Sequence, residues 1–291
     1  MIKKTLQKIF KKISYSIFIK IYGRIEKVID SKDDDRIKIK TINEETSLKY
    51  NIYSIDQGRL YTDRIQDTAA ILDNKIIRQA SFQLRHTRES KIFNGEAKDN
   101  IVLINGTPRK LKNLKGSVLS LLTGGGGNNN YWHWLFDVLP RIGLFCKTAS
   151  INEIDYFLLP DNEKKFQVET LDRLNIPNEK RLSSKNYRHI QAEKLIIVDH
   201  PVVTTGNATN DIMNMPSWIS HWLKKNFITK NVKKTHNKKI YIDRNINKSK
   251  SNQQRQISNE EEVKQCLKKK GFIFFKLHEM DFIDQVELFN N

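Results

Sequence analysis

The sequence predicts an α/β fold, and two observations lead to this prediction. Between about residue 48 and residue 121, short strand-like apolar runs alternate with turn residues. From residue 131 onward, buried-strand patterns alternate with helical patterns. This alternation is typical of a mostly parallel sheet that helices cover on both faces. With 291 residues, 38% of them hydrophobic, the chain can build a core of that size.

Residues 1–29 predict a basic amphipathic helix, because apolar residues recur at helical spacing and lysines fill much of the other side. The apolar positions are Ile2, Leu6, Ile9, Phe10, Ile13, Ile17 and Ile21, and the lysines are Lys3, Lys4, Lys8, Lys11 and Lys12. Such a helix either lies on an anionic membrane surface or packs on the main domain or a partner. The pattern alone does not choose between the two. The charge-rich residues 30–47 are expected to form a linker.

Residues 48–212 are expected to form one α/β domain. Its β-rich first part holds the strand-like runs 48–55, 59–63, 68–73, 75–84 and 100–104. Its second part has a helix at about 129–147, a strand at 154–160, a helix at 163–174 and a strand at 192–199. A connecting helix and linker follow at 213–237.

Residues 238–291 begin a second unit with a strand ending in "YIDR", a helix over 258–271, a strand over 272–277 and a further helix from 281. Two strands are too few for an independent sheet. We therefore expect this unit to be the incomplete start of a second domain.

The composition excludes several classes of protein. The net charge of +18 would suit a nucleic-acid binder, but no basic patch is interleaved with stacking aromatics, so no nucleic-acid partner is expected. Two distant cysteines predict no disulfide framework. No HxH or HExxH spacing occurs, so no metal is expected. No clean secretion signal is present, and the expected location is cytoplasmic.

The stretch "TGGGGNNNYWHWLFDVLPR", residues 123–141, carries the candidate site. On a helix, Asn130, His133, Asp137 and Arg141 share one face. His133 and Asp137 are four residues apart, so they can hydrogen-bond, which orients the imidazole as a general base requires. The preceding glycine run lets backbone amides approach an anion at the helix N-terminus. From spacing alone, a purely structural His–Asp hydrogen bond is the more common outcome.

The run "NNYWHWLFDVLPRIGLF" resembles the signature of the glycosyltransferase family 61 catalytic domain, which in bacterial members reads N-Y-x-H-W-[LM]-x-D-x-L-P-R-[LI]. The resemblance extends over about 50–291, through "GRLYTDRIQDTAAILDNKIIRQASFQ", "FQVETLDRLNIP", "AEKLIIVDHP" and "KKIYIDRN". The matching positions within the signature are Asn130, His133, Trp134, Leu135, Asp137, Leu139, Pro140, Arg141 and Ile142.

The resemblance implies a GT-B-like fold with a Rossmann-type first domain, which would be the acceptor side, and a second Rossmann-type domain that binds the nucleotide sugar. It implies an inverting transfer from a nucleotide sugar to a hydroxyl of a glycan or lipid-linked acceptor, in capsular or other surface polysaccharide synthesis. The family pattern continues past the last residues into a glycine-rich donor loop, so we expect the chain to be C-terminally truncated. The alternative is an inactive transferase fragment that acts as a scaffold.

We predict that His133, oriented by Asp137, is the base or contacts the acceptor; Asp137 as the base is the rival assignment. Arg244 follows a predicted strand, and its planar guanidinium suits the donor diphosphate, with help from Lys248. Further predicted substrate-binding residues are Asn130, Tyr131, Gly126, Gly127 and Arg141. No cofactor is expected besides the donor substrate. Residues 1–29 could hold the protein at the inner face of the cytoplasmic membrane.

Overall fold

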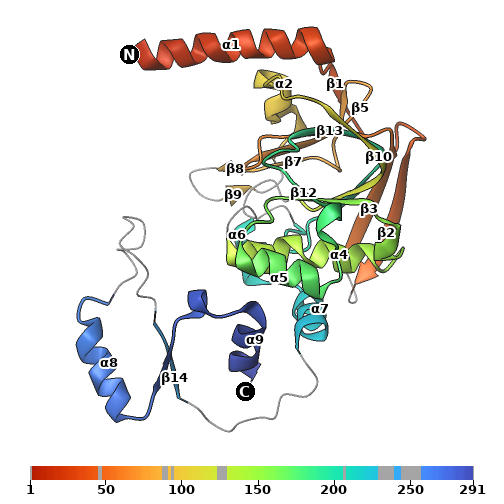
Figure 1. Cartoon of the computed structure of the whole chain (residues 1–291). Helices are drawn as coiled ribbons and strands as arrows, with labels where there is room; N and C mark the ends of the chain where they lie inside the picture. Colours follow the sequence, from red (N-terminus) through yellow and green to blue (C-terminus); the bar gives the residue numbers. More distant parts are fainter. Residues whose placement is uncertain are drawn as a thin grey trace.

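The computed structural model describes residues 2–44, 48–86, 91–92, 95–122, 130–205, 208–228, 239–243 and 257–290. The helices are α1 Ile2–Tyr22, α2 Ile101–Asn105, α3 Tyr131–His133, α4 Pro140–Phe145, α5 Lys165–Arg173, α6 Ala208–Met213, α7 Ser217–Phe227, α8 Glu260–Lys269 and α9 Phe282–Asn290. The helices α4, α5 and α7 lie on one face of a large sheet, and α1 and α2 pack on its N-terminal strands (Figure 1).

Within the described residues, the main sheet has 11 strands, in the order β1-β6-β5-β4-β13-β10-β11-β12, with β2, β3 and β7 beside this path. These strands are β1 Lys27–Ile29, β2 Ile37–Glu44, β3 Leu48–Asp56, β4 Arg59–Thr62, β5 Asp67–Leu72, β6 Lys75–Ile77, β7 Phe82–Gln83, β10 Lys112–Ser120, β11 Tyr156–Leu159, β12 Arg181–Ser183 and β13 His189–Val198. A separate short pair joins β8 Arg85–His86 and β9 Lys91–Ile92.

The sheet is parallel around β10 and, apart from the parallel pair of β1 and β6, antiparallel in its N-terminal part. β10 pairs in parallel with both β11 and β13, and β11 with β12. The strands β2 to β5 are joined by antiparallel pairings, and both β3 and β4 pair antiparallel with β13. The register of β10 against β13 shifts between Leu114 and Ser117, at Gly116, whose φ of 84° favours glycine. β13 belongs to both parts of the sheet, because it pairs in parallel with β10 and antiparallel with β3 and β4.

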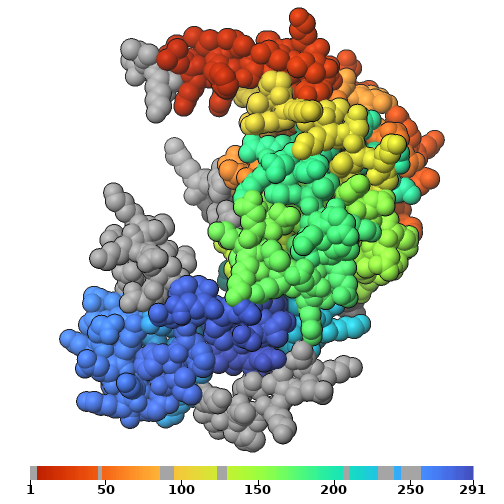
Figure 2. All heavy atoms as spheres, viewed as in Figure 1, coloured from red at the N-terminus to blue at the C-terminus, as the bar shows by residue number. Residues whose placement is uncertain are grey.

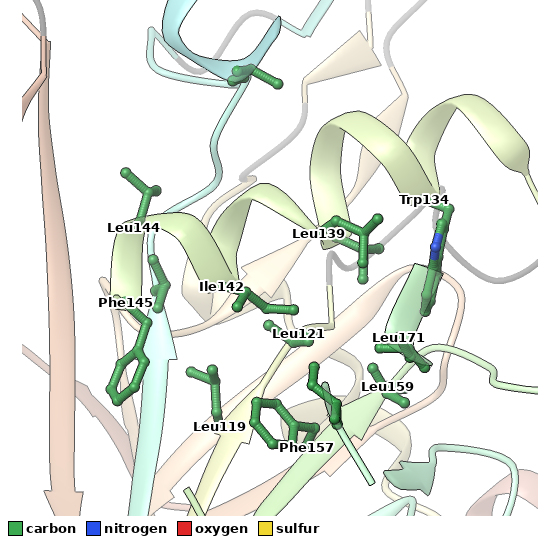
Figure 3. Packing of buried hydrophobic residues seen from close by; sticks show 14 of the residues in the cluster. Leu119, Leu121, Trp134, Leu139, Ile142, Leu144, Phe145, Phe157, Leu159 and Leu171 are labelled. Carbon is green, nitrogen blue, oxygen red and sulfur yellow. The ribbon is translucent and has the colours of Figure 1, made fainter. Parts of the chain in front are cut away.

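The prediction of helices on both faces is wrong for the second face. On one face, α4, α5 and α7 pack on apolar side chains of β10, β11 and β13 (Figure 3). On the other face, alternate residues of the same strands, such as Val118, Leu158 and Ile197, pack against Leu60, Ala70 and Leu72 of the N-terminal strands. The β-rich part thus folds over the parallel strands and takes the place of a second helical layer.

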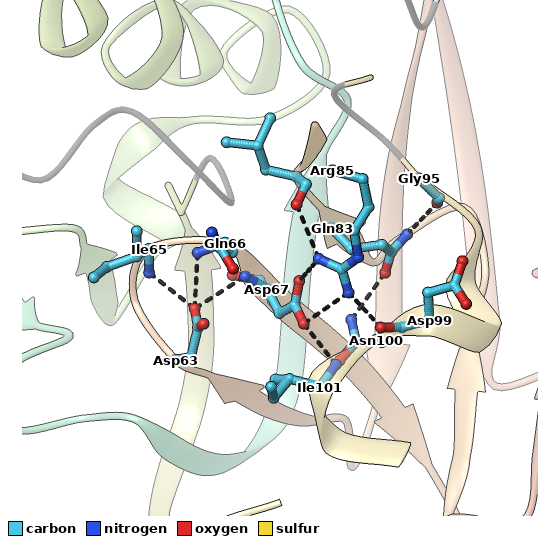
Figure 4. Close-up of polar contacts among 12 residues, drawn as sticks. Asp63, Ile65, Gln66, Asp67, Gln83, Arg85, Gly95, Asp99, Asn100 and Ile101 are labelled. Atoms are coloured by element: carbon cyan, nitrogen blue, oxygen red, sulfur yellow. Dashed lines mark hydrogen bonds and ion pairs between the residues drawn. The ribbon is translucent and has the colours of Figure 1, made fainter. Parts of the chain in front are cut away.

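A buried carboxylate joins the N-terminal strands to α2 (Figure 4). Asp67 is 2% exposed, accepts 2.6 and 3.1 Å hydrogen bonds from the two terminal nitrogens of Arg85, and accepts from the backbone N of Ile101 at 2.6 Å. Residues 100–104, predicted as a strand, form this helix instead. The side chain of Asn100 accepts from the backbone N of Val102, which favours a helix start over a strand.

Two further expectations about the N-terminal region are corrected. The first helix ends at Tyr22 rather than at residue 29, because Gly23 adopts a φ of 79° and residues 27–29 pair with β6. Residues 30–47 are not simply a linker, because β2 pairs with β3 over its whole length. None of the described helices has a stretch long and apolar enough to cross a bilayer.

The C-terminal segment is a strand–helix–strand unit that docks through its last helix. β14 (Ile240–Ile242) pairs in parallel with β15 (Ile273–Phe275), and α8 lies between them in the sequence, as predicted. The backbone N of Phe282 donates to Glu169 of α5 at 2.6 Å, and the Phe282 ring lies 5.1 Å from that of Phe227. Figure 2 shows this segment (blue) at the opposite end of the molecule from α1 (red).

Candidate functional site

The carboxyl ends of β10 and β13 meet at one edge of the sheet. The two strands are parallel neighbours, yet the chain leaves β10 toward β11, on the opposite side from β13. In α/β sheets, ligands bind outside the carboxyl ends of the strands, where the strand order reverses. The segment after β10 supplies His133 and Asp137, and the two residues after β13 are Asp199 and His200.

The helical segment that carries the motif begins at Asn130. The Oδ1 atom of Asn130 accepts from the backbone N of Trp132 at 2.9 Å and of His133 at 3.3 Å, so Asn130 is the N-cap. Asn130 was predicted to lie on the polar face of the helix. Its side-chain oxygen instead binds backbone amides of the first turn, so Asn130 is a capping residue. Capping fixes the first turn and places His133 in it.

The helix contains one π-helical turn, Trp134–Val138, in which the backbone N of Leu139 donates to the carbonyl of Trp134 at 3.0 Å. Pro140 follows directly and has no N–H to offer the carbonyl of Phe136. A proline at this position disfavours the regular α-helical pattern, and π turns of this kind are frequent at functional sites. Asp137 lies inside this widened turn.

Two histidines meet the carboxylate of Asp137. The Nδ1 atom of His133 lies 2.6 Å from Oδ2 of Asp137, and Nε2 of His200 lies 3.6 Å from the same oxygen. The side chain of Asp137 is 5% exposed and that of His200 3%, whereas that of His133 is 29% exposed. The structure thus brings the predicted pair together and adds a second, buried histidine behind it.

The protonation states follow from these contacts. Burial alone would raise the pKa of Asp137, but His200 and His133 together lower it to about 2, so the carboxylate is ionised at neutral pH. An ionised carboxylate only accepts, so Nδ1 of His133 must donate, and in the neutral imidazole Nε2 is then the acceptor. Nδ1 of His200 accepts from the backbone N of Val202 and Val203, which places the proton of the neutral ring on Nε2, toward Asp137.

The buried Arg141 and the half-buried Asp199 add two further charges to this group. Arg141 is 0% exposed, donates to the carbonyl of Leu122 at 2.7 Å and lies over the ring of Phe82. Burial lowers the pKa of Arg141 to about 10, so it stays protonated at neutral pH. Burial raises the pKa of Asp199, which accepts from the backbone N and side chain of Asn51.

Tyr131 lies in a packing contact rather than beside His133. Its ring meets Phe166 edge-on at 4.9 Å and Phe282 of α9 at 6.4 Å. Its hydroxyl lies 3.3 Å from Oε1 of Gln285. Tyr131 therefore joins the motif helix to α5 and to the C-terminal segment.

Four of the predicted site residues, Gly126, Gly127, Arg244 and Lys248, lie outside the described residues. Among the residues that are described, no group of three or more His, Cys, Asp or Glu side chains is arranged to hold a metal. The roles predicted for the site residues stay predictions.

The sequence analysis assigned no role to Asp199 and His200. A signal for them was available, because both follow directly after the apolar run "KLIIV" of a predicted buried strand. Charged and imidazole groups at the carboxyl end of such a strand are placed where α/β proteins bind ligands.

One comparison with known proteins decides the family. The family model described as Glycosyltransferase 61 matches residues 131–291, more than half of the chain. The chain belongs to the glycosyltransferase 61 family. The glycosyltransferase match begins at the helix that carries His133 and runs through the C-terminal segment. It therefore contains both the pair His133–Asp137 and the residues Asp199 and His200 that follow β13. The chain has no match among the curated proteins.

Proposed function

We propose that this family 61 transferase moves a sugar from a nucleotide-sugar donor to a hydroxyl of a glycan or lipid-linked acceptor, with inversion, in the synthesis of capsular or other surface polysaccharide. His133 is the general base in this proposal. It takes the proton of the acceptor hydroxyl while the oxygen attacks the anomeric carbon. The bond from the anomeric carbon to the diphosphate oxygen breaks, and the nucleoside diphosphate leaves.

The observation that carries the proposal is the 2.6 Å contact between Nδ1 of His133 and the buried carboxylate of Asp137. A carboxylate in this place holds the imidazole in one orientation and one tautomer, and it stabilises the imidazolium that forms on proton transfer. Of the two histidines that meet Asp137, His133 is the one whose side chain is partly exposed, whereas that of His200 is buried. An acceptor therefore has access to His133 and not to His200.

Asp137 is the weaker candidate for the base. A pKa near 2 makes the carboxylate a poor proton acceptor at neutral pH, and its side chain is almost fully buried. We assign Asp137 and His200 as positioning residues for His133. Arg141 and Asn130 are also assigned structural roles. Arg141 binds the carbonyl of Leu122, which precedes the glycine-rich run in the sequence, and Asn130 caps the motif helix.

The leaving diphosphate needs positive charge, and we propose Arg244 and Lys248 for this role. Arg244 comes two residues after the end of β14, at the carboxyl end of a strand that is parallel to β15. An arginine there can bind a diphosphate with two parallel hydrogen bonds. The backbone amides of Gly126 and Gly127 precede the motif helix and are proposed to approach the substrate.

The test is nucleotide release by the purified chain from a panel of nucleoside-diphosphate sugars, with and without glycan acceptors. We expect His133→Ala to lower the rate by at least about 100-fold, the usual size of a general-base contribution. His221→Ala is the matched control, because His221 is an exposed histidine on α7, and its rate should equal that of the wild type. Wild-type turnover in His133→Ala would refute the assignment, and no release from any donor by the wild type would favour the scaffold alternative.

A further inference from the structure

α1 presents a continuous apolar stripe to solvent. Its members are between 44% and 68% exposed, and they recur at helical spacing along the whole helix. They are Leu6, Ile9, Phe10, Ile13, Ile17 and Ile21. At 100° per residue, the stripe covers roughly 120° of the helix circumference. Six large apolar side chains exposed in one row are more than the scattered single residues that a soluble surface normally carries.

The opposite face of α1 packs on the rest of the protein. Phe18 is fully buried, with its ring 5.6 Å from that of Tyr61. Tyr15 donates to the carbonyl of Leu103, and Tyr22 donates to the carbonyl of Arg109 at 2.6 Å. These contacts fix the rotation of the helix, so the apolar stripe is held facing away from the body. Figure 1 shows the N-terminal half of α1 extending beyond the sheet.

The charge of α1 has one sign. It contains no acidic residue, and Lys8, Lys11, Lys12 and Lys20 are exposed on it. At 100° per residue, Lys20 lies within the apolar stripe and Lys12 lies about 60° beyond one edge of it, whereas Lys8 and Lys11 project from the other side of the helix. A surface that fits this helix must therefore accept apolar side chains and offer negative charge beside them.

A second copy of the chain meets these requirements poorly. Two such helices packed face to face would bring like-charged lysines together, with no acidic residue on either helix to pair with them. The stripe is also broader than the narrow seam of a coiled coil, and Ser16 and Lys20 fall where a heptad repeat through Leu6, Ile9 and Ile13 would need apolar residues. An anionic lipid surface satisfies both the apolar and the charge requirement.

We propose that α1 is an in-plane anchor that binds an anionic lipid bilayer through this stripe, with its lysines at the headgroups. The inference stands on the burial and charge of α1 alone and is independent of the proposed glycosyl transfer. Because the docked face fixes the helix on the body, binding holds the whole protein in one orientation on the lipid surface.

The experiment is co-sedimentation of the full chain with vesicles of phosphatidylcholine containing about a quarter phosphatidylglycerol, compared with vesicles of phosphatidylcholine alone. We expect binding to the anionic vesicles that weakens at high salt, and weaker binding to the neutral ones. The double variant Ile13→Glu/Ile17→Glu should bind at least about tenfold more weakly, because each change removes the burial of a large apolar side chain.

The control is Ile273→Glu on β15, because Ile273 is 43% exposed, like the stripe residues, but belongs to the C-terminal segment at the opposite end of the molecule from α1 (Figure 2). It should bind the vesicles as the wild type does. Lys8→Gln/Lys11→Gln/Lys12→Gln should reduce binding to the anionic vesicles and leave binding to the neutral ones unchanged. Absence of anionic vesicle binding by the wild type would overturn the proposal. So would a dimer, detected by light scattering, that Ile13→Glu/Ile17→Glu abolishes without any change in vesicle binding.

Discussion

At the scale of single residues, the candidate site is a group of mostly buried charges beside the half-buried His133. Asp137 and Asp199 are carboxyl groups, Arg141 is the cation among them, and His200 is neutral because burial lowers its pKa. The side chain of His133 is 29% exposed, whereas those of Asp137 and His200 are almost fully buried. The two buried groups hold the accessible imidazole, which is the arrangement that a positioned general base requires.

The buried cation gives a prediction about stability. Arg141→Ala would remove a fully buried cation that attracts the carboxylates of Asp137 and Asp199, and it would remove the hydrogen bond to Leu122, so we expect the free energy of unfolding to fall by about 3 to 5 kcal/mol. Urea unfolding followed by circular dichroism measures it. Arg173→Ala, on the exposed face of α5, is the control and should change the stability by less than about 0.5 kcal/mol. A loss below about 1 kcal/mol in Arg141→Ala would mean that the cation is not needed there.

At the scale of elements, the motif helix owes its shape to Pro140. The π turn before this proline places Asp137 beside both histidines, although His133 comes from the preceding helical turn and His200 from the end of β13. The helix is anchored on its other sides by Trp134, whose Nε1 donates to Thr170 of α5 at 2.9 Å, and by Gly143, which allows Trp222 of α7 to come close. These packing contacts fix the position of the helix, and the π turn determines the direction in which Asp137 points.

Replacing the proline should therefore separate activity from stability. Pro140→Ala restores an N–H that can reach the carbonyl of Phe136, which favours a regular α-helix and rotates Asp137 relative to His133. We expect the rate of nucleotide release to fall by about tenfold or more, because small misplacements of catalytic groups are costly. The free energy of unfolding should stay within about 1 kcal/mol of the wild type. Unchanged turnover in this variant would show that the π turn does not set the site geometry.

At the scale of the whole molecule, the strand and helix patterns of the C-terminal half could be read from the sequence. The apolar runs of β11 and β13 and the amphipathic helices α5, α7 and α8 each stand out by their own periodicity. The pair His133–Asp137 could also be predicted from the sequence, because two residues four positions apart on a helix lie on the same face.

The rest depends on contacts between distant segments. The folding of the β-rich part over the second face of the sheet follows from pairings of β13 with β3 and β4, which join residues more than 120 positions apart. His200 meets Asp137 for a similar reason, since β10 and β13 become neighbours only in the sheet. Residues 30–47 looked like a linker because they are rich in charge, and in the described part several of these charges, such as Lys38 and Lys40 of β2, are exposed. Local periodicity contains no information on any of these pairings.

The central claim is that His133 and Asp137 act as one catalytic unit, and a double-mutant cycle on nucleotide release tests it most directly. The variants are His133→Ala, Asp137→Asn and the double variant, each checked for folding by circular dichroism. If Asp137 acts only through His133, the double variant should be about as slow as His133→Ala alone. Losses that add in the double variant, or single variants with wild-type rates, would contradict the account and leave the pair as a structural hydrogen bond.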